Sequence, residues 1–275
     1  MILCHSASKT MQAVCYTRAK LDVFSARLLP FLPEGKNQCE VFDQISQGMF
    51  SRNIELRTQF LTNKIQTLAP HFDQWINLCS GLDCRAFALQ QLQNKKVIRI
   101  DHFASLELAN SLFKKAKLHH PNSLEIAHDL IAENGGELCK KLQSSRVDPQ
   151  KPTFVLWEGA TYYLPVSVVE ATLVALSSYF GNLILLAEFI DKDGYFDVDG
   201  QMHPHAVAAM DYLKNQGEPW IGFFQKETIF RSCLQLGFEK IEITDRSHVE
   251  KEFFHKNLMG NKKMFFLEAH KTITQ

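Results

Sequence analysis

The sequence predicts an α/β fold in which a mainly parallel, seven-stranded sheet is covered by helices on both faces. After residue 74, seven short β-rich runs alternate with segments of mostly helical spacing. Most runs are apolar along their length, which is typical of parallel strands buried on both faces. The predicted strands occupy residues 75–79, 96–101, 124–129, 153–158, 182–189, 238–244 and 263–269.

Residues 1–70 precede these strands and contain no β-rich run. Helical pieces are predicted there at about residues 7–30 and 43–68, on either side of the break Leu32-Pro33-Glu34-Gly35. We therefore expect one domain, residues 1–275, in which a helical cap (1–70) precedes the sheet-forming core (71–275).

Two later segments shape the expected core. Residues 191–225 are inserted between the fifth and sixth strands and are rich in aromatic residues, histidine and glycine. Because ligands bind beyond the carboxyl ends of the strands in open α/β sheets, this insertion and the cap are predicted to roof the binding crevice. The final connection, residues 244–262, is polar and lacks a clear crossover helix. The last strand is therefore expected to be antiparallel.

Composition excludes several classes of protein. The chain has 275 residues, 45% of them hydrophobic, which is enough to bury a core and excludes disorder as the main state. Thirty basic residues balance thirty acidic ones, so there is no long-range field to hold a nucleic acid or an anionic membrane. The most apolar stretch, residues 164–189, is interrupted by polar residues well before the ~18 apolar residues of a membrane span. Function is therefore expected in a local site.

Cysteine usage indicates compartment and metal content. There are seven cysteines, an odd number, with no C-x-x-C pair and no Cys/His cluster at zinc-site spacing. The N-terminus lacks the charged lead and apolar stretch of a signal peptide. We expect reduced thiols, a cytoplasmic location and no metal site.

Acidic residues follow three successive predicted strands. The first strand runs into the turn Cys79-Ser80-Gly81-Leu82-Asp83, which contains small residues that let backbone N–H groups approach a ligand. Asp101 ends the second strand, twenty positions after Gly81, where a carboxylate can accept hydrogen bonds from a ribose. Asp129 and Glu158 end the third and fourth strands. Each acid alone also fits a helix N-cap or a solvated loop, but together they favour a ligand with many donors, such as an adenosine joined to an amine.

Other ligand motifs are absent from the sequence. It contains no G-x-G-x-x-G fingerprint, P-loop, G-x-S-x-G elbow or H-E-x-x-H motif. The missing third glycine argues against a nicotinamide cofactor, so a nicotinamide-dependent reductase is the least favoured of the readings kept open.

Several ordered motifs resemble the leucine carboxyl methyltransferase-like enzymes, a family that includes bacterial O-methyltransferases associated with polyketide biosynthesis. The resemblance implies a Rossmann-like class I methyltransferase fold, S-adenosylmethionine as cofactor and S-adenosylhomocysteine as product. The motifs are Ser8-Lys9-Thr10, Arg57-Thr58-Gln59-Phe60, Asn77-Leu78-Cys79-Ser80-Gly81-Leu82-Asp83-Cys84-Arg85-Ala86-Phe87, Ile100-Asp101, Asp129-Leu130, Glu158-Gly159-Ala160-Thr161-Tyr162-Tyr163-Leu164-Pro165 and Gly217-Glu218-Pro219-Trp220.

The resemblance assigns residues to the methionine end of that cofactor. Lys9 and Arg57 would pair with its carboxylate, for which the planar guanidinium of an arginine is well suited. Arg52 is a poorer candidate than Arg57, because its spacing to the first strand fits less well. Glu158 would face the cofactor's amine.

The resemblance also assigns the adenosine end, with one departure. Cys79 and Gly81 would press their backbone against the cofactor, Asp101 would hold the ribose hydroxyls, and Asp129 and Leu130 would frame the adenine. The family usually has Gly-Ala-Gly where this chain has Cys79-Ser80-Gly81. A Cβ and a thiol at position 79 are expected to crowd the cofactor unless φ is negative there and the side chain points away.

Residues for the methyl acceptor are less defined. Tyr162 and Tyr163 follow the fourth strand and are candidates to orient an acceptor oxygen, although packing of their rings explains them equally well. Trp220 in the late insertion is a candidate wall of an apolar acceptor pocket, although such aromatics also simply close a core.

The acceptor decides whether a general base is needed. A carboxylate is already ionised near neutral pH and needs none, which agrees with the absence of an evident His/Asp dyad. A phenol or alcohol would benefit from a base, and the candidates are His203, His205, His102 and His128. Each also fits a surface or loop position, so none is assigned.

The expected function is O-methylation of a carboxylate, or a hydroxyl, on a small, partly apolar metabolite of polyketide type. Methylation of a protein's C-terminal carboxylate is the alternative among enzymes, disfavoured because little inserted material is available to shape a protein-docking surface. A non-catalytic cofactor-binding protein that drifted at Cys79 is the alternative outside enzymes. No nucleic-acid or membrane partner is expected.

Overall fold

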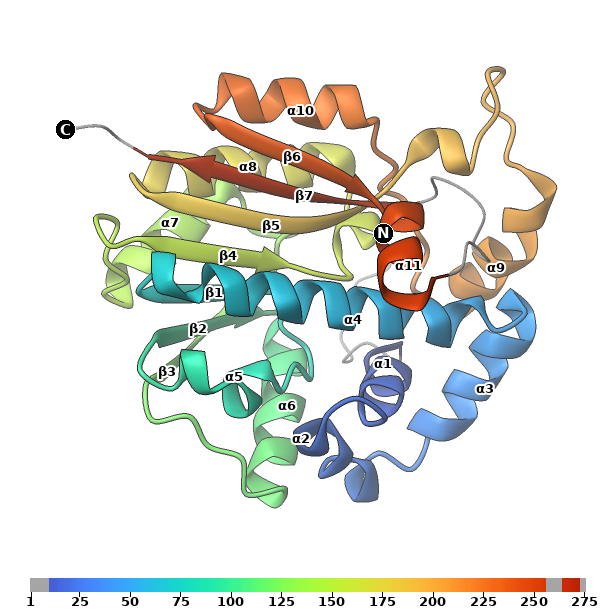
Figure 1. Ribbon diagram of the computed structural model, residues 1–275, viewed down its shortest axis with the longest axis horizontal. Coiled ribbons are helices and arrows are strands. Elements are labelled where there is room, and N and C mark those ends of the chain that lie inside the picture. The colour runs from blue at the N-terminus through green and yellow to red at the C-terminus, as the bar shows by residue number, and fades with distance from the viewer. Residues whose placement is uncertain (1–9, 256–263, 273–275) are drawn as a thin grey trace.

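The structure is a computed structural model that describes residues 10–255 and 264–272 (Figure 1). Within these residues, seven strands form one sheet in the order β3-β2-β1-β4-β5-β7-β6. The strands are β1 (Gln74–Leu78), β2 (Lys96–Asp101), β3 (Ser123–Ala127), β4 (Thr153–Trp157), β5 (Leu183–Ile190), β6 (Lys240–Asp245) and β7 (Met264–Lys271).

Pairing within the sheet confirms the predicted fold class. Neighbouring strands from β3 to β5 pair in parallel, for example with Ile76 beside Ile98 on one side and Val155 on the other. Strand β7 pairs antiparallel with both β5 and β6, as expected for the last strand. All seven predicted strands are present, with ends shifted by at most two residues.

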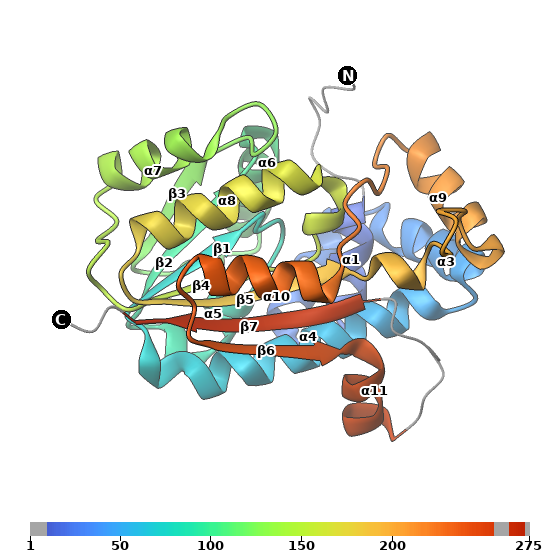
Figure 2. The ribbon, with the colours of Figure 1, turned by 90° about the horizontal axis from the view of Figure 1, so that it is seen from above.

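Helices cover both faces of the sheet (Figures 1 and 2). Helix α4 lies along one face with α11, and α7, α8 and α10 lie on the other. The helices are α1 (Thr10–Arg18), α2 (Val23–Ala26), α3 (Gly35–Ser46), α4 (Met49–Leu68), α5 (Arg85–Ala88), α6 (Phe103–Lys115), α7 (Gly135–Ser144), α8 (Val166–Tyr179), α9 (Pro204–Asn215), α10 (Lys226–Gln235) and α11 (Arg246–Phe254).

The inner strands are largely apolar because each supplies side chains to two cores, whereas the edge strands β3 and β6 contribute to only one. Along β1, Ile76 and Leu78 pack toward α7, α8 and α10, whereas Trp75 packs toward α4. Successive strand residues point to opposite faces, so only a continuous apolar run can fill both layers. Trp75, Ile76 and Leu78 are all fully buried, and this packing holds the carboxyl end of β1 in place within the sheet.

Helices α3 and α11, like α9 in the insertion, lie largely in segments where no helix was predicted. Helix α3 begins at Gly35, two residues after the proline that interrupts the N-terminal region, and occupies part of the expected break. Helix α11 occupies the polar connection before the last strand. Its buried residues are Arg246, Val249 and Glu250, which have helical spacing, but two of the three are charged and so give no apolar periodicity.

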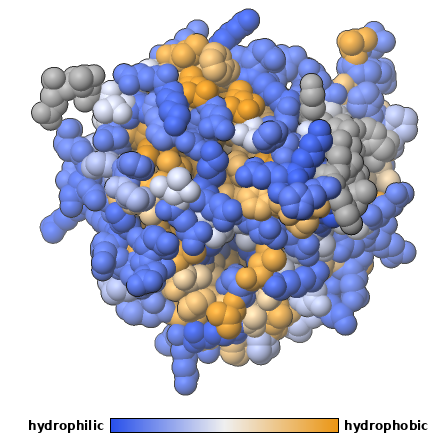
Figure 3. Space-filling model, in the orientation of Figure 1, coloured by the Kyte–Doolittle hydropathy of each residue, from blue (hydrophilic) through white to orange (hydrophobic). Residues whose placement is uncertain are grey.

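Helices α1, α3 and α9 gather beyond the carboxyl ends of the parallel strands (Figure 1). Helix α1 packs against α3 and α4, and α3 contacts α9 from the late insertion. The N-terminal helices and the insertion therefore meet over the strand ends. The face shown in Figure 3 is largely hydrophilic, with apolar residues in small separate patches. Among the described residues, no helix combines the length and the apolar character needed to cross a membrane.

Candidate active site

A cavity of about 620 Å³ opens beyond the carboxyl ends of β1, β2 and β4. Its volume lies within the range of about 300–1,000 Å³ that is usual for small-molecule sites. The walls come from the turn after β1, the segment after β4, and helices α1, α3, α4 and α9. The elements expected to roof the crevice therefore enclose a space of ligand size.

The turn after β1 is held by Asp101 at the end of β2. One carboxylate oxygen of Asp101 accepts a hydrogen bond from the Gly81 N–H at 2.7 Å, and the other accepts one from the His102 N–H at 2.7 Å. Gly81 has φ +48°, and an added Cβ would lie 3.1 Å from Met11 Sδ of α1. A glycine thus allows the turn and α1 to approach closely.

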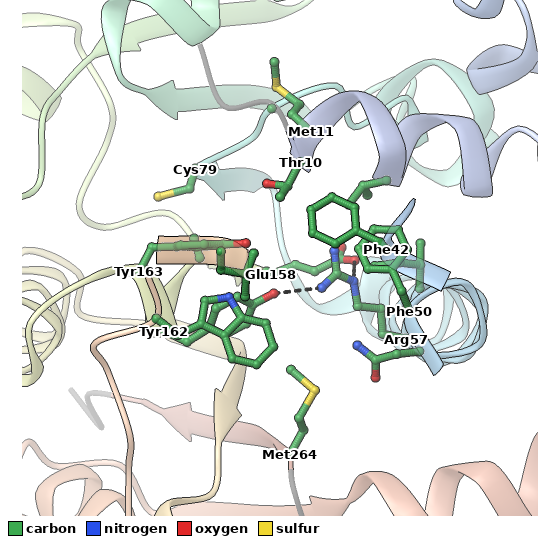
Figure 4. A pocket seen from close by; sticks show the side chains of 18 of the residues that line it. Thr10, Met11, Phe42, Phe50, Arg57, Cys79, Glu158, Tyr162, Tyr163 and Met264 are labelled. Carbon is green, nitrogen blue, oxygen red and sulfur yellow. Dashed lines mark hydrogen bonds and ion pairs between the residues drawn. The ribbon is translucent and has the colours of Figure 1, made fainter. Parts of the chain in front are cut away.

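Cys79 adopts a left-handed backbone conformation with φ +57°. The sequence analysis required a negative φ here if the side chain was not to crowd a cofactor, and this requirement is not met. A non-glycine residue in this region costs about 1–2 kcal/mol. Figure 4 shows the sulfur directed away from Arg57. Burial, reinforced by the charge of Asp101, raises the pKa of the Cys79 thiol, which stays protonated at neutral pH.

Glu158, directly after β4, lies among three arginines. Its Oε1 is 2.5 Å from Arg18 Nη2 of α1 and 3.0 Å from Arg57 Nε of α4. Its Oε2 accepts a hydrogen bond from Arg85, which also pairs with Asp83. Burial alone would raise the pKa of Glu158, but Arg18, Arg85 and Arg57 together hold it well below its usual range. The carboxylate is therefore ionised at neutral pH.

Arg57 joins this group to β5. Its Nη1 donates to Tyr162 Oη at 3.1 Å and to Glu188 Oε2 at 3.2 Å. Glu188 also accepts a hydrogen bond from the Gly159 N–H at 3.0 Å. Gly159 has φ +71°, and a Cβ there would lie 2.9 Å from Arg57 Nη2, so the glycine after Glu158 makes room for the guanidinium. In Figure 4, Arg57 and Glu158 point toward each other.

Most of the predicted site residues line this cavity. The lining includes eight of them: Arg57, Cys79, Gly81, Asp101, Glu158, Tyr162, Tyr163 and Trp220. Lys9 lies outside the described residues. Arg52, the poorer carboxylate candidate, instead pairs with Glu250 at 2.6 Å.

Three predicted residues are not part of the cavity wall. Asp129 accepts hydrogen bonds from the Ile131 and Ala132 N–H groups and so caps the turn after β3. Leu130 packs against the main core. His203 precedes α9, and its N–H donates to the backbone oxygen of Tyr195.

Three guanidinium groups surround Glu158. It was expected to face a cofactor amine, but both of its oxygens are engaged by guanidinium groups. An ammonium group could reach this carboxylate only by joining or displacing an arginine.

Tyr162, Tyr163 and Trp220 pack against one another at the cavity wall. The Tyr162 ring centroid is 4.8 Å from that of Tyr163 and 4.9 Å from that of Trp220. Tyr162 is 4% exposed, and burial raises the pKa of Tyr163 to about 12. The rings therefore both close a core and present a wall to the cavity, so the two interpretations of these residues are compatible.

Sequence reasoning missed Arg18, Arg85 and Glu188 as members of the site. Glu188 carried a usable signal, because a charged residue inside the apolar run of β5 must be buried and needs a partner. Arg85 was part of the motif after β1 but was given no role. Arg18 had no local signal, since its partner Glu158 is 140 positions away in the chain.

This strand order, the antiparallel β7 and a cavity beyond the strand ends define a Rossmann-like fold of the class I methyltransferase type. Two solved structures share the fold. A "DUF574 family protein" from Streptomyces avermitilis superposes with a TM-score of 0.69 at 10% identity, covering 97% of this chain and 98% of that one. A "putative methyltransferase" from Thermobifida fusca gives a TM-score of 0.61 at 16% identity, covering 81% and 82%.

The sequence places the chain in a family. Residues 13–177 match the family described as leucine carboxyl methyltransferase, and the chain belongs to it. A relative from Mycobacteroides abscessus named "Putative S-adenosyl-L-methionine-dependent methyltransferase" is 27% identical over 201 residues, or 70% of this chain. The match spans 62% of that relative's length. The family resemblance in the sequence motifs is thus confirmed.

Proposed function

We propose that the protein is an S-adenosylmethionine-dependent O-methyltransferase whose acceptor is a small, partly apolar molecule with a carboxylate or hydroxyl group. Family membership supports methyl transfer, and the relative's name supports the cofactor. The observation that carries the proposal is the pairing of Asp101 with the Gly81 turn inside a cavity of small-molecule size.

The residues at the strand ends fit such a cofactor. Gly81 and Asp101 both line the cavity, so the backbone of the turn and a carboxylate for ribose hydroxyls lie side by side. Burial raises the pKa of Asp101, although the two backbone hydrogen bonds oppose the shift. Hydroxyl donors from a ribose would stabilise the ionised form further. When bound, the cofactor supplies a sulfonium methyl group for in-line displacement by an acceptor oxygen.

The chain's own part is alignment and exclusion of water. Arg57 is held by Glu158, Glu188 and Tyr162, so its position does not depend on a ligand. Burial raises the pKa of Tyr162 well above its usual range, which makes its hydroxyl a poor base at neutral pH. A carboxylate acceptor suits this site because it needs no base.

The alternatives make different predictions for binding. A protein C-terminal carboxyl methyltransferase would share the cofactor but would need a surface to dock its substrate. A non-catalytic protein would bind the cofactor without transferring its methyl group. A nicotinamide-dependent enzyme would bind NAD instead.

Calorimetric titration of the full chain with S-adenosylmethionine, S-adenosylhomocysteine and NAD tests the proposal. We expect sub-millimolar binding of the first two only. Asp101→Ala should abolish binding, because two charge-assisted hydrogen bonds to the ribose would be lost. Asp73→Ala is the matched control, since Asp73 is exposed at the opposite end of β1. Full affinity in a folded Asp101→Ala protein would refute the ribose role, and NAD binding alone would refute the proposed cofactor.

A further inference from the structure

The part of the cavity away from the β1 turn has mostly apolar walls. These walls come from four separate segments of the chain, namely α3, α4, the insertion between β5 and β6, and the start of β7. Among the side chains that line it are Phe42, Phe50, Tyr195, Met210, Trp220 and Met264. An apolar compartment of this kind favours a ligand with a flat or bulky apolar body.

One cation is set into this apolar wall. Arg246, the first residue of α11, lines the cavity and is 4% exposed. Its Nη1 donates to Asn53 Oδ1 at 3.3 Å, and its Nε is buried without a hydrogen-bond partner among the described residues. A guanidinium carries five N–H donors, so most of its hydrogen-bonding capacity is unused.

Arg246 differs from the other buried arginines of the described chain. Arg18, Arg57, Arg85 and Arg99 each lie within 4 Å of a carboxylate oxygen, whereas Arg246 has no such partner. Residues 1–9, 256–263 and 273–275 contain no aspartate or glutamate. Every acidic side chain of the protein is therefore placed, and none pairs with Arg246.

The neighbouring charges are already matched. Around the cavity, the carboxylates of Asp83, Glu158, Glu188 and Glu250 pair with four arginines, which are Arg18, Arg52, Arg57 and Arg85. Arg246 is a fifth arginine beyond this balanced set. Burial lowers its pKa, and Tyr195, Glu188 and Glu250 offset the effect only in part. An uncompensated buried charge is costly, and an anion bound from solution would remove that cost.

We propose that Arg246 and Asn53 bind a carboxylate group of the methyl acceptor, while the apolar walls hold its flat apolar body. The identification of this ligand as the acceptor rests on the proposed function. The anion-binding subsite itself rests on the cavity and on the unpaired guanidinium within it.

The position of Asn53 relates this subsite to the rest of the cavity. Asn53 and Arg57 are four residues apart on α4, so they project from the same side of the helix, about 6 Å apart along its axis. Arg57 belongs to the Glu158 and Glu188 network. The carboxylate subsite therefore lies about one helical turn from that network, within reach of a small molecule.

A carboxylate fits this place better than a phosphate. Both anions accept paired hydrogen bonds from a guanidinium. A phosphate dianion, however, brings more charge and loses more hydration in an apolar compartment with a single unpaired cation. Asn53 adds only a neutral amide, so the subsite is matched to one negative charge.

The test is the preference of the full chain for a charged over a neutral probe of the same shape. Binding of 2-naphthoate, 2-naphthalenemethanol and inorganic phosphate is measured by calorimetry, with and without S-adenosylhomocysteine. We expect wild-type protein to bind 2-naphthoate at least about tenfold more tightly than the neutral alcohol, a difference of about 1.4 kcal/mol. Phosphate should bind more weakly than 2-naphthoate. Equal binding of the two naphthalene probes, no binding of 2-naphthoate, or tighter binding of phosphate would overturn the proposal.

Variants assign the preference to Arg246. Arg246→Gln should bind both naphthalene probes alike, and Arg231→Gln, at an exposed site on α10, should behave as wild type. If Arg246→Gln does not fold, Arg246→Lys decides, because it keeps the charge but loses the planar fork and should weaken 2-naphthoate binding severalfold. Unchanged affinity in either folded Arg246 variant would overturn the proposal. A different outcome would refute the proposed function but not the subsite. In it, wild-type protein does not bind S-adenosylhomocysteine, yet it still prefers 2-naphthoate to the neutral alcohol and this preference depends on Arg246.

Discussion

Substitutions at Cys79 test the left-handed backbone of the turn after β1. With φ +57°, an alanine should retain the strain of the cysteine, whereas a glycine should release it. The strain is about 1–2 kcal/mol. The greater flexibility of glycine in the unfolded chain opposes the gain in stability by about 0.5–1 kcal/mol. We therefore expect Cys79→Gly to be more stable than Cys79→Ala by up to about 1.5 kcal/mol.

Cys139 offers a matched control for this comparison. It is also a partly buried free cysteine, but it lies inside α7. There, glycine should be less stable than alanine by about 1 kcal/mol, so the sign of the Gly–Ala difference reverses between the two sites. Urea unfolding measures both differences. The assigned backbone conformation would be refuted if Cys79→Ala were at least as stable as Cys79→Gly while, at Cys139, alanine remained more stable than glycine.

The same pair of variants addresses the cofactor. Because Cys79→Gly restores the residue type usual in the family, we expect it to bind S-adenosylhomocysteine as tightly as wild type or more tightly. A large loss of affinity in Cys79→Gly, with stability unchanged, would show that the thiol itself belongs to the binding site.

Two further predictions concern the sheet and its connections. An added Cβ at Gly222 would lie 2.5 Å from the backbone oxygen of Thr161, so Gly222→Ala should lower the free energy of unfolding by more than about 1 kcal/mol in a urea titration, and wild-type stability would contradict this packing. Contacts with His270 and Lys64 lower the pKa of Glu268 to about 2, so its carboxylate stabilises the fold above its unfolded pKa of about 4.5 and loses this effect as pH falls toward 2. Glu268→Gln should therefore lower the free energy of unfolding by at most about 3 kcal/mol at pH 7. The difference in this free energy between variant and wild type should become smaller from about pH 5 to about pH 3. A difference that does not change with pH would refute the pairing.

The strands could be predicted because their burial on two faces leaves a local trace. Strands β1, β2, β4 and β5 each contribute to a core on both sides, so apolar residues follow one another along most of their length. Helix α11 left no such trace, since Arg246 and Glu250 replace apolar residues on its buried face. Its charges are explained only by the cavity and the ion pairs that other segments of the chain complete.

The candidate site was predictable where one short segment carries several of its parts. The turn from Cys79 to Asp83 and the acid at Asp101 are set by strand ends, which the sequence locates well. Arg18 and Arg246 could not be found in this way. Arg18 meets a partner 140 positions away, and Arg246 meets Asn53 at a separation of 193.

The buried ion pairs also change how the family motifs are understood. Glu158 and Arg57 were expected to meet the two charged groups of a cofactor's methionine end, yet here they pair with each other and with Arg18 and Glu188. Removing one member of such a set leaves the others as uncompensated buried charges, at a cost of about 3–5 kcal/mol. The motifs therefore hold α1, α4, β4 and β5 together as well as forming a site. Under the two proposals above, ligand recognition would depend on cavity groups that this network does not saturate, which are the Asp101 turn and Arg246.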